Sequence, residues 1–137
     1  MALRRQFSMG KEDTQYLEAN HPNWETIVDG NNKVLLLHDF LIPDGYTART
    51  STAAIIIPAN YPTQGLDMVY FHPHIARSDG QAIRQTNVQV AFDGISYQRW
   101  SRHYTVTRWK PDEDSIATHV MAIRDWLIRA LEGGAVA

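Results

Sequence analysis

The chain contains no cysteine among its 137 residues. Disulfides, cysteine-ligated zinc or iron–sulfur sites and thiolate nucleophiles are therefore excluded. Long apolar runs are also missing, since the longest, at residues 34–37 and 53–58, are too short to cross a bilayer. No apolar stretch follows the basic start at residues 1–5, so we expect a cytoplasmic protein without an export signal or a membrane association.

An excess of charge of one sign is missing as well. The 13 Lys and Arg residues nearly balance the 15 Asp and Glu residues, which gives a net charge of -2 and no bulk attraction for nucleic acid. The composition, with 44% hydrophobic and 20% charged residues, is typical of one globular domain. We expect a single domain over residues 1–137, with a core from about residue 9 to residue 132 and short tails.

The first half of the chain predicts a helix followed by strands. A helix is expected over residues 9–20, with Ser8 as its cap, and Pro22 would end it. β-rich segments separated by Gly, Asn and Pro turns follow without an intervening helix, which indicates an antiparallel meander. The four expected strands cover residues 24–28, 33–42, 47–57 and 66–71.

The second half predicts a long loop, a small hairpin and a helix. Asp93-Gly94 suits a type I′ turn between strands at 88–92 and 95–100. Asp112 or Asp114 would cap a last helix that runs to about residue 132 and stops at Gly133-Gly134. Apolar residues recur there at helical spacing, and His119 falls on the polar side of that pattern. The fold class is α+β.

Three short motifs resemble those of the ubiquitin-conjugating enzyme superfamily. Tyr61-Pro62 follows an apolar strand, His72-Pro73-His74-Ile75 is similar to a histidine-proline-asparagine-isoleucine signature, and Trp109-Lys110-Pro111 is similar to a tryptophan-x-proline. The run at 97–103, Tyr-Gln-Arg-Trp-Ser-Arg-His, with Trp109 and Thr118-His119, resembles the prokaryotic family-E branch. The resemblance implies a ubiquitin-conjugating fold. It also implies three partner proteins: a ubiquitin-like protein of the single or multi-ubiquitin-like kind, a ThiF-type activating enzyme and a JAB peptidase. A role in antiviral defence is implied as well.

The family carries ubiquitin on a cysteine as a thioester, and this chain has no cysteine. Counting from the His-Pro signature places the cysteine position near Ala82 or Ile83, which have no nucleophile. In the family, the cysteine sits eight residues before the tryptophan of Trp-x-Pro, and the resemblance therefore implies Ser101 as the equivalent position. The second count is favoured because an insertion fits best in the irregular segment 76–86. A second departure is His74, which replaces the asparagine of the signature.

Ser101 could hold the acyl group as an oxyester if a base lies within reach. His103 is two residues away and would share a face with Ser101 in a strand. Arg102 could steady a carboxylate, and His72 and His74 are candidate orienting or oxyanion groups. The alternatives are an ordinary strand hydroxyl, an imidazole that binds a backbone carbonyl, and a His72 that stabilises a turn.

Contacts with partner proteins are expected in two places. The first helix of this fold usually meets the activating enzyme, so Lys11, Glu12 and Gln15 are candidate contacts. Arg99, Arg102 and Arg108 could dock an acidic tail or form a solvated face.

We predict no cofactor and no metal site, because His72-x-His74 lacks a third ligand. The favoured function is a ubiquitin-conjugating-like enzyme that accepts a ubiquitin-like protein as an oxyester on Ser101. The alternative is a catalytically inactive scaffold that binds the ubiquitin-like protein or the activating enzyme. An enzyme acting on a small molecule has no motif behind it.

Overall fold

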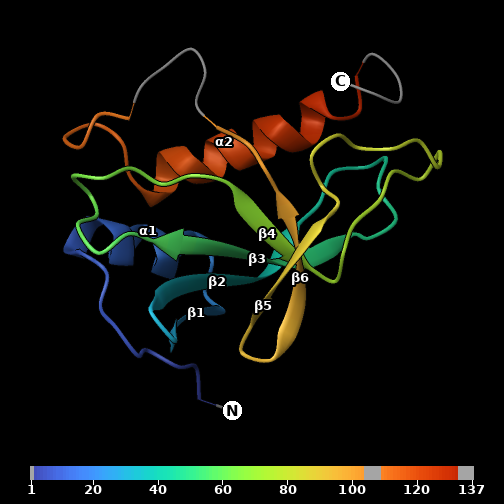
Figure 1. The fold of residues 1–137 in the computed structure, drawn as a ribbon. Coiled ribbons are helices and arrows are strands. Elements are labelled where there is room, and N and C mark those ends of the chain that lie inside the picture. The colour runs from blue at the N-terminus through green and yellow to red at the C-terminus, as the bar shows by residue number, and fades with distance from the viewer. Residues whose placement is uncertain (1, 104–108, 133–137) are drawn as a thin grey trace.

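The computed structural model describes residues 2–103 and 109–132, and the predicted α+β class is confirmed (Figure 1). Within these ranges the chain forms two helices and one antiparallel sheet of six strands. The elements are α1 (Lys11–Asn20), β1 (Trp24–Asp29), β2 (Asn32–Leu41), β3 (Thr50–Ile57), β4 (Val69–His72), β5 (Val88–Phe92), β6 (Ile95–Trp100) and α2 (Ile116–Arg129).

The sheet has the strand order β1-β2-β3-β4-β6-β5, so the expected small hairpin is not a separate element. β6 pairs antiparallel with β4, with Val69 opposite Trp100. The predicted four-stranded meander and the predicted small hairpin are both present, and the hairpin extends the meander at its β4 edge. The local sequence could not reveal this pairing, because it joins strands that a long loop separates.

The hairpin turn itself is of the predicted kind. Asp93 and Gly94 have φ angles of 56° and 73°, and a type I′ turn needs positive φ at both central residues. The sheet curls so that this turn reaches the β1 edge, and in Figure 1 the lower end of the hairpin is seen beside β1. The Asp93 backbone N–H donates to the Asp29 carboxylate at 2.9 Å, and the Arg4 guanidinium pairs with Asp93 at 2.7 Å.

Because the sheet curls, both of its faces are buried. One face packs against α2, whose residues Ile116, Val120, Ile123 and Leu127 are fully buried. The other face forms a smaller cluster inside the curl, which contains Ile27, Val34, Leu36, Ala54, Tyr70, Phe92 and Tyr97. Burial on both faces explains why β2 is a continuous apolar run instead of an alternating pattern.

The helix starts differ from the predicted ones. α1 begins behind Gly10, which provides no side-chain cap, so the expected Ser8 cap is wrong. The cap of α2 is Ser115, whose side chain forms a capping box with Thr118. The predicted caps Asp112 and Asp114 are wrong, and the Asp114 carboxylate accepts the Lys110 backbone N–H at 2.8 Å instead. Gly133-Gly134 lie outside the described residues.

His119 is fully buried, so its predicted surface position is wrong. Its Nε2 lies 2.9 Å from the Met68 carbonyl oxygen, and its ring meets the edge of Trp126. Burial is the main cause that lowers the pKa of His119 to about 4, which the hydrogen bond to Met68 partly opposes. The imidazole is therefore neutral at pH 7.

We expect the protein to lose stability as the pH falls from 7.5 to 5. The unfolded His119 titrates near its ordinary pKa of 6.5, whereas the folded one titrates near 4, so the unfolded state binds the extra proton between these values. The contribution of neutral His119 is complete above pH 6.5, and its loss by pH 5 is about 2 kcal/mol. Urea unfolding at both pH values measures it. His119→Gln, which does not titrate, should show a smaller decline, and an equal decline would contradict this assignment.

Candidate functional site

The segment 101–103 continues past the end of β6 and lies beside the chain that enters β4. The last ladder pair joins Val69 to Trp100, and beyond it the Met68 backbone N–H donates to the Arg102 carbonyl at 3.2 Å. Antiparallel chains place residues opposite one another in reverse order. The continuation of this pairing therefore brings Asp67 next to His103.

His103 and Asp67 form the most direct side-chain pair of this region. The imidazole Nδ1 lies 3.0 Å from Oδ1 and 2.9 Å from Oδ2 of the carboxylate. The exposed fractions of the two side chains are 58% and 49%. A carboxylate at Nδ1 favours the tautomer with the proton on that nitrogen, which leaves Nε2 as a proton acceptor. The pair can therefore act as an oriented general base.

Sequence reasoning missed Asp67, which is 36 residues from His103. The only signal was a carboxylate at the second position of the fourth expected strand, which covers residues 66–71. That signal becomes informative only once β4 is known to pair with β6.

Ser101 is half-buried and directly follows β6. Its backbone N–H donates to the Gln85 carbonyl at 3.0 Å. Because the strand ends at Trp100, the argument that Ser101 and His103 share a strand face does not apply. Among the described contacts, the imidazole of His103 bonds Asp67 and no hydrogen bond joins it to Ser101. Ser101 and His103 are therefore close in sequence, but none of the described hydrogen bonds joins their side chains.

Arg102 is buried, with 8% of its surface exposed, and its contacts are internal. One guanidinium nitrogen donates to the carbonyls of Arg84 and Ser101, both at 3.1 Å, and the group lies over the Trp100 ring at 4.9 Å. Together with the bond from Ser101 to Gln85, Arg102 therefore holds the loop between β4 and β5 against the Ser101 segment, and its guanidinium is engaged in contacts within the protein.

His72 and His74 lie at the other end of β6. The Nδ1 of His72 is 3.1 Å from the Ser96 carbonyl oxygen, and the Nε2 of His74 is 3.4 Å from the Ser96 hydroxyl. Ser96 and Ser101 are five residues apart along an extended chain, which corresponds to roughly 16 Å. The structure therefore does not bring either histidine to Ser101.

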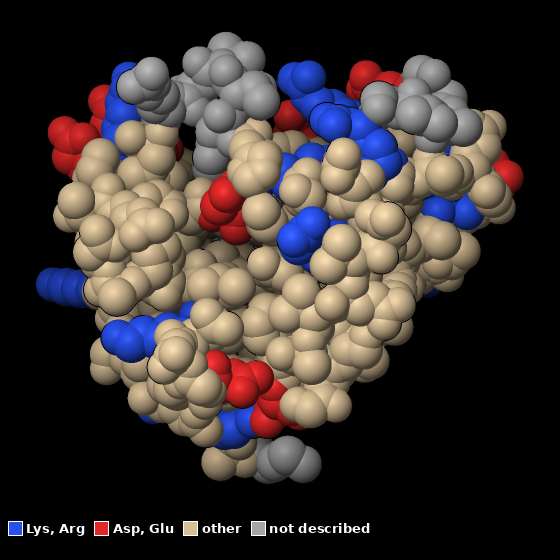
Figure 2. Space-filling view, viewed as in Figure 1, with Lys and Arg blue, Asp and Glu red and all other residues tan. Residues whose placement is uncertain are grey.

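The other candidates are scattered. Lys11, Glu12 and Gln15 are exposed on α1, and Arg99 is half-buried in β6, where its Nε is buried without a hydrogen-bond partner. Arg108 lies outside the described residues. Ala82 is exposed and Ile83 packs against the core. Figure 2 shows a face on which acidic and basic side chains are interspersed, without a large patch of one sign.

The Tyr61-Pro62 and Trp109-Lys110-Pro111 motifs contact each other. The Trp109 indole N–H donates to the Pro62 carbonyl at 2.8 Å, and the ring centres of Tyr61 and Trp109 are 6.1 Å apart. The indole lies directly on Gly65, where an added Cβ would be 2.4 Å from the Trp109 Cγ. Only glycine fits this close approach, so Gly65 allows the Trp109 ring to pack directly on the backbone.

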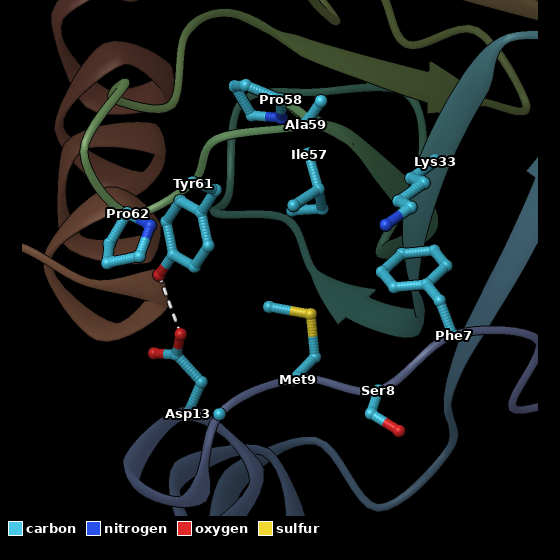
Figure 3. Close-up of a pocket in the computed structure, with 11 residues that line it drawn as sticks. Phe7, Ser8, Met9, Asp13, Lys33, Ile57, Pro58, Ala59, Tyr61 and Pro62 are labelled. Carbon is cyan, nitrogen blue, oxygen red and sulfur yellow. Dashed lines mark hydrogen bonds between the residues drawn. The ribbon is translucent and has the colours of Figure 1, made fainter.

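A cleft of about 250 Å³ lies between the start of α1 and the end of β3 (Figure 3). Its walls combine apolar side chains, including Phe7, Met9 and Ile57, with polar groups, and Lys33 is one of the lining residues. The Tyr61 hydroxyl points to the Asp13 carboxylate and donates to it at 2.6 Å. None of the predicted catalytic residues lines this cleft.

Within residues 2–103 and 109–132, no three His, Asp or Glu side chains gather in a way that could hold a metal ion. In the same ranges neither helix is long and apolar enough to cross a membrane.

A family model described as prokaryotic E2 family E matches residues 9–130. Comparison with curated proteins found no match, and comparison with solved structures found none either. The E2-like match gives the chain a ubiquitin-conjugating-like role and, in general terms, interaction with a ubiquitin-like protein and an activating enzyme. Since the match covers most of the sequence and agrees with an α+β fold around a curled antiparallel sheet, the chain belongs to prokaryotic E2 family E.

Proposed function

We propose that this protein accepts the C-terminus of a ubiquitin-like protein from an activating enzyme and holds it as an oxyester on Ser101. The observation that carries the proposal is the Asp67–His103 pair, whose imidazole is two residues along the chain from the serine that the Trp-x-Pro spacing selects. A chain of an E2 family that has no cysteine needs another nucleophile if it is to carry an acyl group. A serine next to an oriented imidazole meets that need.

The chemistry is acyl transfer. The Ser101 hydroxyl oxygen attacks the activated carbonyl carbon at the tail of the ubiquitin-like protein, while His103 Nε2 takes the hydroxyl proton. A carbon–oxygen bond forms, the bond to the activating enzyme's leaving group breaks, and that group receives the proton. Asp67 keeps the imidazole in the required tautomer and stabilises its charged form.

The proposed partners follow from the same reading. The activating enzyme is of the ThiF type and contacts the exposed residues Lys11, Glu12 and Gln15 of α1. The ubiquitin-like protein, single or multi-ubiquitin-like, docks an acidic tail near Arg99 and Arg108, and a JAB peptidase reverses the modification. The pathway is a bacterial conjugation system in the cytoplasm that serves antiviral defence.

Reconstitution tests this function. With the partner activating enzyme, ATP and the ubiquitin-like protein, we expect a covalent adduct that resists reducing agent and is cleaved by hydroxylamine. Ser101→Ala should abolish the adduct, because no other group at that position can accept the acyl group. Ser96→Ala, an exposed serine at the far end of β6, is the matched control and should form it normally. An unchanged adduct on Ser101→Ala would overturn the assignment.

An inactive scaffold is the second candidate. The observation that favours it is that the imidazole of His103 bonds Asp67 and, among the described contacts, not Ser101. In this case no adduct forms with any variant, yet the protein still binds the ubiquitin-like protein or the activating enzyme. Titration calorimetry with each partner, beside the adduct assay, separates the two functions.

A further inference from the structure

A buried histidine of α2 lies behind the turn that carries Asp67. His119 has no exposed surface, and its Nε2 lies 2.9 Å from the Met68 carbonyl oxygen. A carbonyl oxygen only accepts, so Nε2 carries the proton of the neutral imidazole and donates it. Burying a polar ring among apolar side chains costs free energy unless it is hydrogen-bonded, and the bond to Met68 offsets part of that cost.

The turn that His119 holds has an unusual backbone. Met68 has a φ of 57°, in the left-handed region that non-glycine residues rarely adopt. Such a conformation persists only when the surrounding contacts impose it. The Met68 N–H donates to the Asp67 Oδ1 at 3.1 Å and to the Arg102 carbonyl at 3.2 Å. Its carbonyl group is held from the other side by His119.

The position of the Asp67 carboxylate therefore depends on hydrogen bonds of two Met68 backbone groups, the N–H and the carbonyl. Oδ1 accepts the Met68 N–H, and both carboxylate oxygens accept from His103 Nδ1. If Met68 relaxes to a negative φ, its N–H turns away from Asp67 and Arg102, and the carboxylate loses its orientation. A hydrogen-bonded chain thus runs from α2 through the turn to the exposed imidazole.

We propose that His119 is a positioning residue that acts through Met68 and Asp67 on the imidazole of His103. The proposal rests on the proposed function, in which His103 accepts the Ser101 proton. His119 does not touch the acyl group. It fixes the turn from which Asp67 orients the base, so its loss changes the rate of acylation and not the affinity for the donor.

Matched variants test the hydrogen bond separately from the volume. His119→Phe keeps a ring and removes the donor, whereas His119→Gln keeps an N–H that can reach the Met68 carbonyl. We expect His119→Phe to lower the rate of adduct formation at saturating donor by about 10–100-fold with an unchanged KM. His119→Gln should restore most of the rate. Equal rates for both variants would overturn the proposal. Should His119→Phe fail to fold, His119→Leu takes its place.

A double-mutant cycle tests the route of the effect. If His119 acts through Asp67, combining His119→Phe with Asp67→Ala should be no slower than Asp67→Ala alone. If the two losses multiply, His119 acts by another route and the proposal is wrong.

A readout without partners keeps the proposal separate from the proposed function. The ¹⁵N chemical shifts of the His103 ring report which nitrogen carries the proton. In the wild-type protein we expect the Nδ1–H form, and in folded His119→Phe a shift toward a mixture of tautomers, which His119→Gln reverses. Unchanged His103 shifts would overturn the positioning role. Absence of any adduct with the wild-type protein would overturn the proposed function alone.

Discussion

Asp67→Asn is expected to slow formation of the Ser101 oxyester by about 10²–10⁴-fold. The carboxylate lies within 3.0 Å of the His103 Nδ1 with both oxygens, so it holds the tautomer whose Nε2 is free of a proton. An amide has the same size, but its NH₂ group can face Nδ1 and then favours the tautomer with the proton on Nε2. That nitrogen no longer takes the serine proton. Single-turnover time courses at saturating donor measure the loss.

Two controls make the result specific. Asp44→Asn changes an exposed aspartate that none of the contacts among the described residues connects with His103, and its rate should match the wild type. His103→Ala should be at least as slow as Asp67→Asn, and the combination of both should be no slower than His103→Ala alone, because the two residues act as one unit. A normal rate for Asp67→Asn would remove Asp67 from the mechanism and with it the observation on which the proposed function depends.

The elements predicted from local signals agree with the structure. The strand segments lie between Gly, Pro and Asn turns, and Asp93-Gly94 marks the hairpin turn, because turn chemistry is a property of a few adjacent residues. The apolar repeat from Ile116 to Leu127 predicted the buried face of α2. The helix caps were missed, because several residues before each helix can accept an N–H and tertiary contacts select among them.

Long-range pairing explains what was missed at the candidate site. The β4–β6 ladder joins residues about 30 positions apart, so no local pattern shows that Asp67 faces His103. The spacing that pointed to Ser101 and His103 is local and needed no such knowledge. The structure adds the third residue, and it separates His72 and His74 from the other two.

His119 was misplaced for a different reason. It is three residues after Ile116 and four before Ile123, so its position lies on the apolar stripe of α2. The prediction placed it on the polar side of that stripe, although its offsets from Ile116 and Ile123 are those of the apolar face. A carbonyl group at the right depth, that of Met68, lets the core accept the ring. This hydrogen bond compensates for the polarity of the buried ring.

Asp13 is the second residue whose replacement should have a large effect, and sequence reasoning did not single it out. It lies in the first turn of α1 with 9% of its surface exposed. Its Oδ2 accepts the Tyr61 hydroxyl at 2.6 Å, and its Oδ1 accepts the Ile116 backbone N–H at 3.1 Å. One carboxylate thus joins α1, the loop after β3 and the first turn of α2. Burial is the main cause that raises the pKa of Tyr61, and the nearby carboxylate adds to it.

We expect Asp13→Ala to lower the free energy of unfolding by about 3 kcal/mol, because the Tyr61 hydroxyl and the Ile116 N–H both lose a charged acceptor. The melting temperature should fall by about 10 °C. Thermal and urea unfolding measure both quantities.

Glu12→Ala, at the exposed neighbouring position, is the matched control and should change stability by less than about 0.5 kcal/mol. Tyr61→Phe removes the hydroxyl that Asp13→Ala leaves without its acceptor. Combining the two changes should therefore cost less than the sum of the single losses, since the double variant has no orphaned hydroxyl. If Asp13→Ala is no more harmful than Glu12→Ala, or if the two losses add, the carboxylate does not hold these three elements together. The positions of the motifs at Tyr61 and Trp109 would then depend on other contacts, among them the Trp109–Pro62 hydrogen bond and the packing of Trp109 on Gly65.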